Sequence, residues 1–128
     1  MLNAECRMLN EVLMKENACV SKSFEFAVRI VNLYKYLSAE HKEYVLSKQL
    51  LRCGTSIGAN VAEAQRGQSR ADFLAKMSIA LKEANEAQYW IKLLYQTDYL
   101  NHAQYSSINH DVDELISILT AICKNASK

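Results

Sequence analysis

Apolar side chains recur at steps of three and four residues through most of this chain, and no proline interrupts them. Such steps place side chains on one face of an α-helix, and proline is the residue that most strongly breaks one. The chain also has only three glycines, whereas β-sandwiches with many tight turns normally need more of both residues. With 128 residues, half of them hydrophobic, it can form one domain with its own core. The predicted fold class is therefore all-α.

Four segments carry this periodicity, and short linkers join them. They are, in order, about 21–38, 42–66 and 70–97, and a fourth that begins at a cap formed by Asn101 and Gln104. Short linkers make successive helices antiparallel, and near-heptad seams are typical of helices that cross at about 20°. We predict an antiparallel up-down-up-down four-helix bundle over residues 21–125. Residues 1–20 are expected to form a short N-terminal helix or a loose arm.

The first of these segments is apolar on two sides. One stripe consists of Phe24, Ala27, Val31 and Tyr34, and the other of Phe26, Ile30, Leu33 and Leu37. A helix with two apolar stripes is expected to contact more than one neighbour.

The second segment contains "LLRCGTSIGANVAEAQRG", which has two glycines inside a helical pattern. Gly54, Gly58 and Ala62 are four residues apart and form a stripe with small side chains. Each glycine costs roughly 1 kcal/mol of helix stability relative to alanine, so something is expected to approach this backbone closely. A neighbouring helix, a bound ligand and a second subunit are the alternatives.

Two rows of polar side chains are predicted to face each other across the second and third segments. One row is Arg52, Ser56, Asn60 and Glu63, and the other is Glu83, Glu86 and Trp90. We expect Arg52 to pair with a carboxylate and Asn60 to bridge backbone or side-chain groups. The rows form a network that fixes helix register or a subunit interface, a solvated face, or a ligand site.

The residue types argue against catalysis. Metal sites in four-helix bundles combine Glu with a Glu-x-x-His motif, but here Glu83 is followed by Glu86. Ser56 has no evident histidine partner, and the four cysteines form no CxxC pair. We therefore predict no enzyme, no catalytic residues, no cofactor and no metal. The alternative hypothesis is a small-molecule or metal-binding bundle that uses Glu63, Glu83 and Glu86.

The formal net charge of +1 identifies no partner class, but basic residues are enriched around the second segment. The candidates for nucleic-acid contact are Lys42, Lys48, Arg66, Arg70 and Lys76. If copies of the chain formed a ring, the field of these residues would add over the copies. The N-terminus lacks the apolar core of a signal peptide, and no window has eighteen apolar residues. We expect a cytoplasmic protein without a membrane partner.

Two stretches resemble a known bacterial family. "FEFAVRIVNLYKYL" and "LLRCGTSIGANVAEAQRGQSRADFLAKMSIALKEANEAQYWIKLL" are similar to the 23S rRNA intervening-sequence proteins, also called S23-type proteins. The most specific parts are "SIGANVAEA" (56–64) and "KMSIALKEANEAQYWI" (76–91), and the resemblance covers roughly residues 21–122.

The resemblance implies a four-helix bundle that assembles into rings, as homopentamers, and it supplies no catalytic residues. The family is itself similar to the accessory proteins of diversity-generating retroelements, which are basic pentameric barrels that bind nucleic acid and a reverse transcriptase. The near-neutral charge of this chain departs from that pattern. The expected function is a non-enzymatic, ring-forming adaptor that binds RNA or a protein partner. A purely structural oligomer is the remaining alternative.

Overall fold

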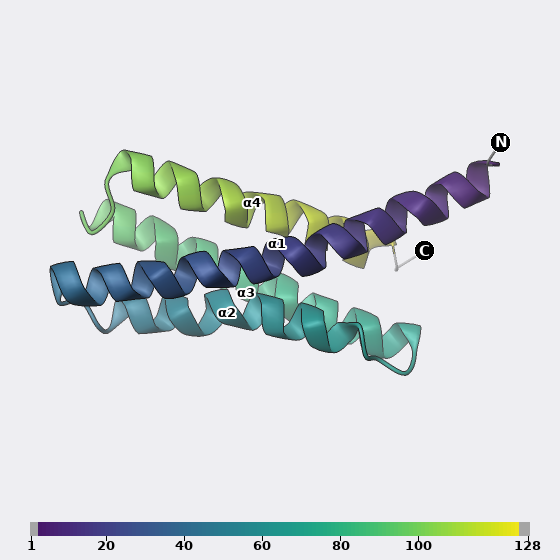
Figure 1. Cartoon of the computed structure of the whole chain (residues 1–128), viewed down its shortest axis with the longest axis horizontal. Coiled ribbons are helices and arrows are strands. Elements are labelled where there is room, and N and C mark those ends of the chain that lie inside the picture. Colours follow the sequence, from purple (N-terminus) through teal and green to yellow (C-terminus); the bar gives the residue numbers. More distant parts are fainter. Residues whose placement is uncertain (1–2, 126–128) are drawn as a thin grey trace.

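The computed structural model describes residues 3–125, which form four α-helices (Figure 1). The helices are α1 (Ala4–His41), α2 (Leu46–Ala64), α3 (Arg70–Gln96) and α4 (His102–Asn125). Each helix packs against its neighbours in sequence, and contacts between α1 and α4 close the bundle. The predicted antiparallel four-helix bundle is confirmed. No helix within the described part of the chain is long and apolar enough to cross a membrane.

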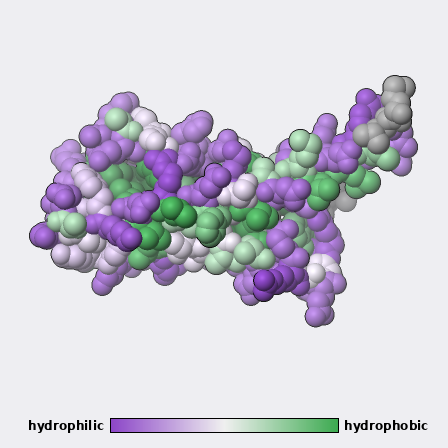
Figure 2. Space-filling view, in the orientation of Figure 1, coloured by the Kyte–Doolittle hydropathy of each residue, from purple (hydrophilic) through white to green (hydrophobic). Residues whose placement is uncertain are grey.

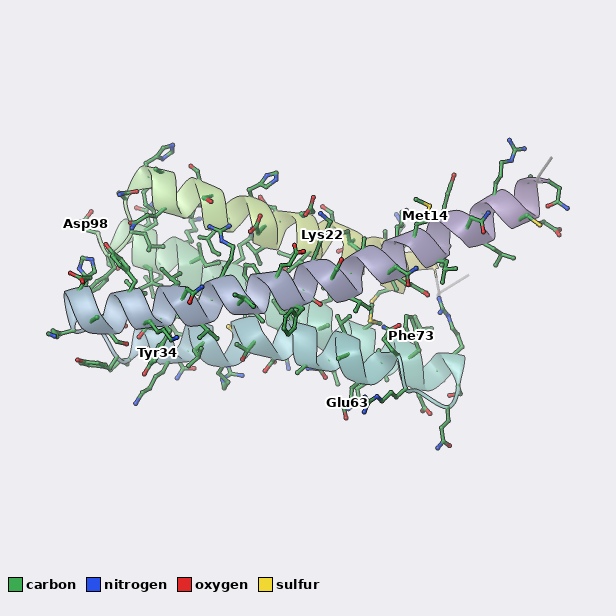
Figure 3. All side chains as sticks on the ribbon, viewed as in Figure 1. Met14, Lys22, Tyr34, Glu63, Phe73 and Asp98 are labelled. Carbon is green, nitrogen blue, oxygen red and sulfur yellow. The ribbon has the colours of Figure 1, made fainter. Side chains whose placement is uncertain are left out.

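The first helix is much longer than predicted. We expected it to start near residue 21, but α1 begins at Ala4 and continues without a break to His41. Its N-cap is Asn3, whose side-chain oxygen accepts a hydrogen bond from the backbone N–H of Cys6 at 2.8 Å. Its first turns project beyond the other helices (Figure 1). Met14 lies on this part of α1 (Figure 3).

The core runs along the centre of the bundle, and all four helices contribute to it. Its largest fully buried side chains include Phe26, Ile30 and Leu37 of α1, Leu50 and Ile57 of α2, Met77, Ile91 and Leu94 of α3, and Leu115 and Leu119 of α4. In α3 the buried positions also include Ala80, Ala84 and Ala87. Small side chains at the centre of α3 let neighbouring helices come close, while the larger Leu74 and Leu81 pack at the edge of the core.

Glycines bring α2 close to α1. A Cβ atom added at Gly54 would lie 2.9 Å from two side-chain carbons of Ile30, and one at Gly58 would lie 3.1 Å from the carbonyl oxygen of Ser23. Real Cβ atoms essentially never come within 3.0 Å of such neighbours. Among the three alternatives for this stripe, these distances identify a neighbouring helix at Gly54 and Gly58, whereas Ala62 is exposed.

Polar residues fix where the helices begin and end. Ser69 caps α3 by accepting from the N–H of Asp72 at 3.1 Å. At the start of α4, the side chains of Asn101 and Gln104 each accept from the other residue's N–H, at 2.8 and 2.9 Å. After α1, Lys42 adopts a left-handed backbone with φ of 54°. This conformation ends the helix and lets the chain turn into α2.

Candidate functional site

Arg52 and two glutamates link α2 to α3 at the surface. The guanidinium of Arg52 lies 2.6 Å from a carboxylate oxygen of Glu86 and 3.5 Å from one of Glu83. The hydrogen bond to Glu86, followed by the charges of Glu86 and Glu83, raises the pKa of Arg52. Arg52 is largely exposed, whereas Glu83 is only 16 % exposed. The cluster is therefore an ion-paired rim between two helices.

The other members of the polar rows do not complete this network. The hydroxyl of Ser56 donates to the carbonyl of Arg52 at 2.7 Å, and the amide of Asn60 donates to the carbonyl of Ser56 at 2.8 Å. Both bonds stay within α2, so Asn60 makes no hydrogen bond to α3 in the described structure. The indole Nε1 of Trp90 is buried and has no hydrogen-bond partner among residues 3–125. A fully bonded inter-helix network is therefore not formed.

The three glutamates proposed as an alternative metal or ligand site do not come together. Glu63 lies 3.3 Å from the amine of Lys76, near the α2–α3 turn. Arg52, which holds Glu83 and Glu86, lies eleven residues earlier on α2, roughly 16 Å along the helix axis. Within the described ranges, no group of three or more His, Cys, Asp or Glu side chains could hold a metal ion. The geometry contradicts the metal-site hypothesis for this cluster.

The five basic residues proposed for nucleic-acid contact lie at two opposite ends of α2. Lys42 and Lys48 flank its beginning, and the other three flank its end, roughly 27 Å away. The second group is also partly neutralised: Arg70 pairs with Glu16 of α1 at 3.0 Å and lies over the ring of Phe73, and Lys76 pairs with Glu63. The predicted basic corner is therefore reduced to Arg66, which has no ion-pair partner within the described residues.

The buried thiols are held in the protonated form. Burial, together with the neighbouring charge of Glu86, raises the pKa of Cys53 to about 12. Burial and the proximity of Cys123 raise the pKa of Cys19 to about 12 as well. A thiol must lose its proton to act as a nucleophile or metal ligand. Cys53 therefore acts as a small core residue, while Cys123 is half-buried and Cys6 is exposed.

Sequence reasoning missed Glu43, which organises the start of α2. Its carboxylate is buried and accepts hydrogen bonds from the N–H groups of Val45, Leu46 and Ser47 at 3.0, 2.8 and 2.7 Å. Burial acts to raise the pKa of Glu43, but these hydrogen bonds outweigh it and lower the pKa overall. The sequence signal that could have identified this role is a carboxylate placed just before the start of a helix.

The outer face of α1 is an apolar surface that the bundle leaves uncovered. Of the two predicted stripes, that of Phe26, Ile30, Leu33 and Leu37 packs into the core, and the other faces away from the bundle. Phe24 is 69 % exposed, Val28 46 % and Val31 36 %. A shallow hollow on this face is lined by Phe24, Ala27, Val28, Val31, Asn32 and Lys35. Apolar residues extend along this face and reappear on the projecting end of α1 (Figure 2).

Comparisons with known proteins agree with this architecture. The 23S rRNA-intervening sequence protein family matches residues 15–121. A crystal structure of a protein of unknown function from the S23 ribosomal protein family of Bacteroides thetaiotaomicron superposes with a TM-score of 0.84 at 59 % sequence identity. The superposition covers 86 % of this chain and 98 % of that one. No curated protein matches the sequence. From its match over residues 15–121, the chain belongs to the 23S rRNA-intervening sequence protein family.

Proposed function

We propose that this protein is a non-enzymatic adaptor that assembles into a ring of five identical copies and holds a protein partner. The observation that carries the proposed assembly is the apolar outer face of α1, where Phe24, Val28 and Val31 are exposed beside a shallow hollow. Apolar surfaces of this kind mark sites of association in water. The number five comes from the resemblance to ring-forming S23-type proteins.

The polar groups support a role without catalysis. Arg52 compensates Glu83 and Glu86, the hydroxyl of Ser56 is bonded to its own helix, and the buried thiols stay protonated. Each of these groups is thus engaged in the fold or held in its protonated form.

Light scattering on a size-exclusion column tests the assembly. Phe24→Ser removes an exposed aromatic anchor without touching the core, so the bundle should stay folded while the assembly dissociates. Loss of a central aromatic anchor raises a dissociation constant by about tenfold or more. Tyr89→Ser is the matched control, because Tyr89 is 60 % exposed but lies on α3. A wild-type monomer at micromolar concentration would contradict the proposal, as would equal dissociation of both variants.

RNA binding is a second candidate, favoured by the hollow at the α2–α3 turn. Arg66 and Lys76 line it, together with Glu63, Gly67, Gln68, Asp72 and Ala75. In a ring, Arg66 would recur once per copy and the fields would add. The family's description, which refers to intervening sequences of 23S rRNA, motivates the same test.

Binding of a structured rRNA fragment and an unrelated RNA should be compared at low and near-physiological salt. Specific recognition predicts that binding to the rRNA fragment survives the higher salt and is weakened by Arg66→Gln. Lys48→Gln, at the other end of α2, should leave it unchanged. Binding of both RNAs that disappears with salt would reflect counterion release alone and would contradict an RNA role.

A further inference from the structure

The outer face of α1 carries a heptad pattern that runs from the projecting end of the helix into the bundle. Steps of four and three residues connect Cys6, Asn10, Leu13, Asn17, Val20, Phe24, Ala27, Val31 and Tyr34. Seven of these nine residues are hydrophobic. In heptad notation the a positions are Asn10, Asn17, Phe24 and Val31, and the others are d positions. This is the spacing of a coiled-coil seam.

This seam faces away from the bundle. Lys22 and Arg29, on the opposite side of α1, bind Glu114 and Asp111 of α4. Ile30 and Ser23 face α2 at the two glycines. The seam is therefore left uncovered, and Leu13 is 55 % and Phe24 69 % exposed. Leu9 and Met14 flank it and are each 69 % exposed.

The projecting part of α1 packs against almost nothing within the bundle. Between Asn3 and Lys15 every residue is exposed except the half-buried Val12. In proteins most helical stability comes from tertiary packing of an apolar face, and these turns have almost no such packing within the described chain. A segment with such a regular apolar seam gains most of its helical stability from packing against another helix.

Two asparagines in the seam favour another copy of α1 as the helix that packs against it. Asn10 and Asn17 both occupy a positions and both are exposed. An asparagine at an a position weakens a coiled coil, but it specifies a parallel alignment in register, in which the amide meets the same amide of the partner. In an antiparallel alignment of two copies a positions face d positions, so these amides would face apolar d residues. The pattern therefore fits copies of the same helix.

We propose that the outer face of α1 forms a parallel, in-register coiled coil with other copies of this chain. The proposal rests on the assembly proposed above and specifies its contact. From Cys6 to Val31 the seam is roughly 38 Å long on a helix about 10 Å wide, so its projected area is on the order of 400 Å². A stable interface buries about 800 Å² per partner. The neighbouring bundle surfaces must therefore contribute the rest.

The exposed Cys6 provides a direct test. In a parallel, in-register coiled coil the thiols of Cys6 from adjacent copies occupy one layer, and a mild oxidant removes two electrons and two protons to join them by a disulfide. The full-length wild type at low micromolar concentration should give a covalent dimer under copper–phenanthroline. Cys6→Ser should abolish it. Lys15→Cys in the Cys6→Ser background should also give none, because Lys15 lies at the f position, opposite the seam.

Combining cross-linking with light scattering separates the two proposals. Cys6 cross-linking without cross-linking at position 15 supports the coiled coil. Assembly without Cys6 cross-linking, or with equal cross-linking at both positions, overturns the coiled coil but leaves the adaptor ring standing. A protein that stays monomeric overturns both.

Discussion

At the level of single residues, Glu43 shows how one carboxylate sets a helix boundary. Its oxygens satisfy three backbone N–H groups at the start of α2 that no helical carbonyl can reach. Its own backbone carbonyl also accepts from the hydroxyl of Ser47 at 2.8 Å. The turn between α1 and α2 is thereby locked by a side chain that the apolar pattern of the sequence does not reveal.

Glu43→Gln should lower the free energy of unfolding by about 1 kcal/mol at pH 7, as expected for loss of a helix cap. Because the pKa of Glu43 in the folded state lies below its ordinary value of 4.5, its stabilisation is present above about pH 4.5. It is lost as the pH falls through the lower, folded-state pKa. Urea unfolding at pH 7 and at pH 3 should show a difference between wild type and variant that shrinks in acid.

The control for this experiment is Glu40→Gln, which changes an exposed glutamate at the end of α1. It should have little effect at either pH. A loss of stability from Glu43→Gln that is equally large at pH 3 would contradict a charge-dependent role for Glu43.

At the level of helices, the contact between α1 and α2 depends on Gly54. Gly54→Ala should gain roughly 1 kcal/mol of helix propensity, but the new Cβ would overlap the side chain of Ile30. Overpacking of a core typically costs about 1–3 kcal/mol, so we expect net destabilisation in thermal or urea unfolding. Ile30→Ala should remove the overlap, so the double variant should be more stable than the sum of the single changes predicts. Additive effects would show that Ile30 does not limit this site.

The asparagines of the outer face give a second prediction for α1. Asn17→Ile should strengthen self-association, because it replaces a polar a residue by one that packs well in a coiled coil. It should also broaden the distribution of copy numbers, because the residue that specifies register is lost. Analytical ultracentrifugation over a concentration series measures both effects. The matched change Ser21→Ile, at an exposed e position beside the seam, should strengthen association without broadening the distribution. Weaker association of Asn17→Ile would contradict the proposed seam.

The sequence predicted the number, type and order of the helices because each carries its own apolar periodicity. It did not reveal that α1 starts at Ala4, because the N-terminal turns lack a buried face: Met8, Leu9 and Leu13 are all exposed. Because these residues do not pack against the other helices, the apolar pattern that predicts the core did not extend to them.

The candidate site could be predicted only where two helices meet. The pairing of Arg52 with carboxylates of α3 follows from spacing and antiparallel packing. The distance between Glu63 and Glu83 depends on how far α2 is shifted along α3, which spacing within one helix does not determine. The five basic residues separate for a different reason, because Lys42 and Lys48 flank the beginning of α2 and the other three lie beyond its end. To predict which surface residues of two helices come together, one must know how the helices are shifted relative to each other, and only the structure shows this shift.

At the level of the whole molecule, the bundle buries one side of α1 and presents the other to solvent. A monomer would expose Phe24, Leu13 and Met14 permanently, and the projecting turns of α1 would have nothing to pack against. An assembly around the outer faces of α1 resolves both problems at once. The central claim is therefore that the working unit contains several copies of this chain.

Native mass spectrometry of the wild-type protein tests this claim most directly, because it counts the copies. With a chain of 14.5 kDa, we predict a dominant species of five times this mass that dissociates on dilution or with Phe24→Ser. A different single copy number above one would retain the assembly but contradict the ring of five. A protein that remains at the mass of one chain at all concentrations would contradict the account.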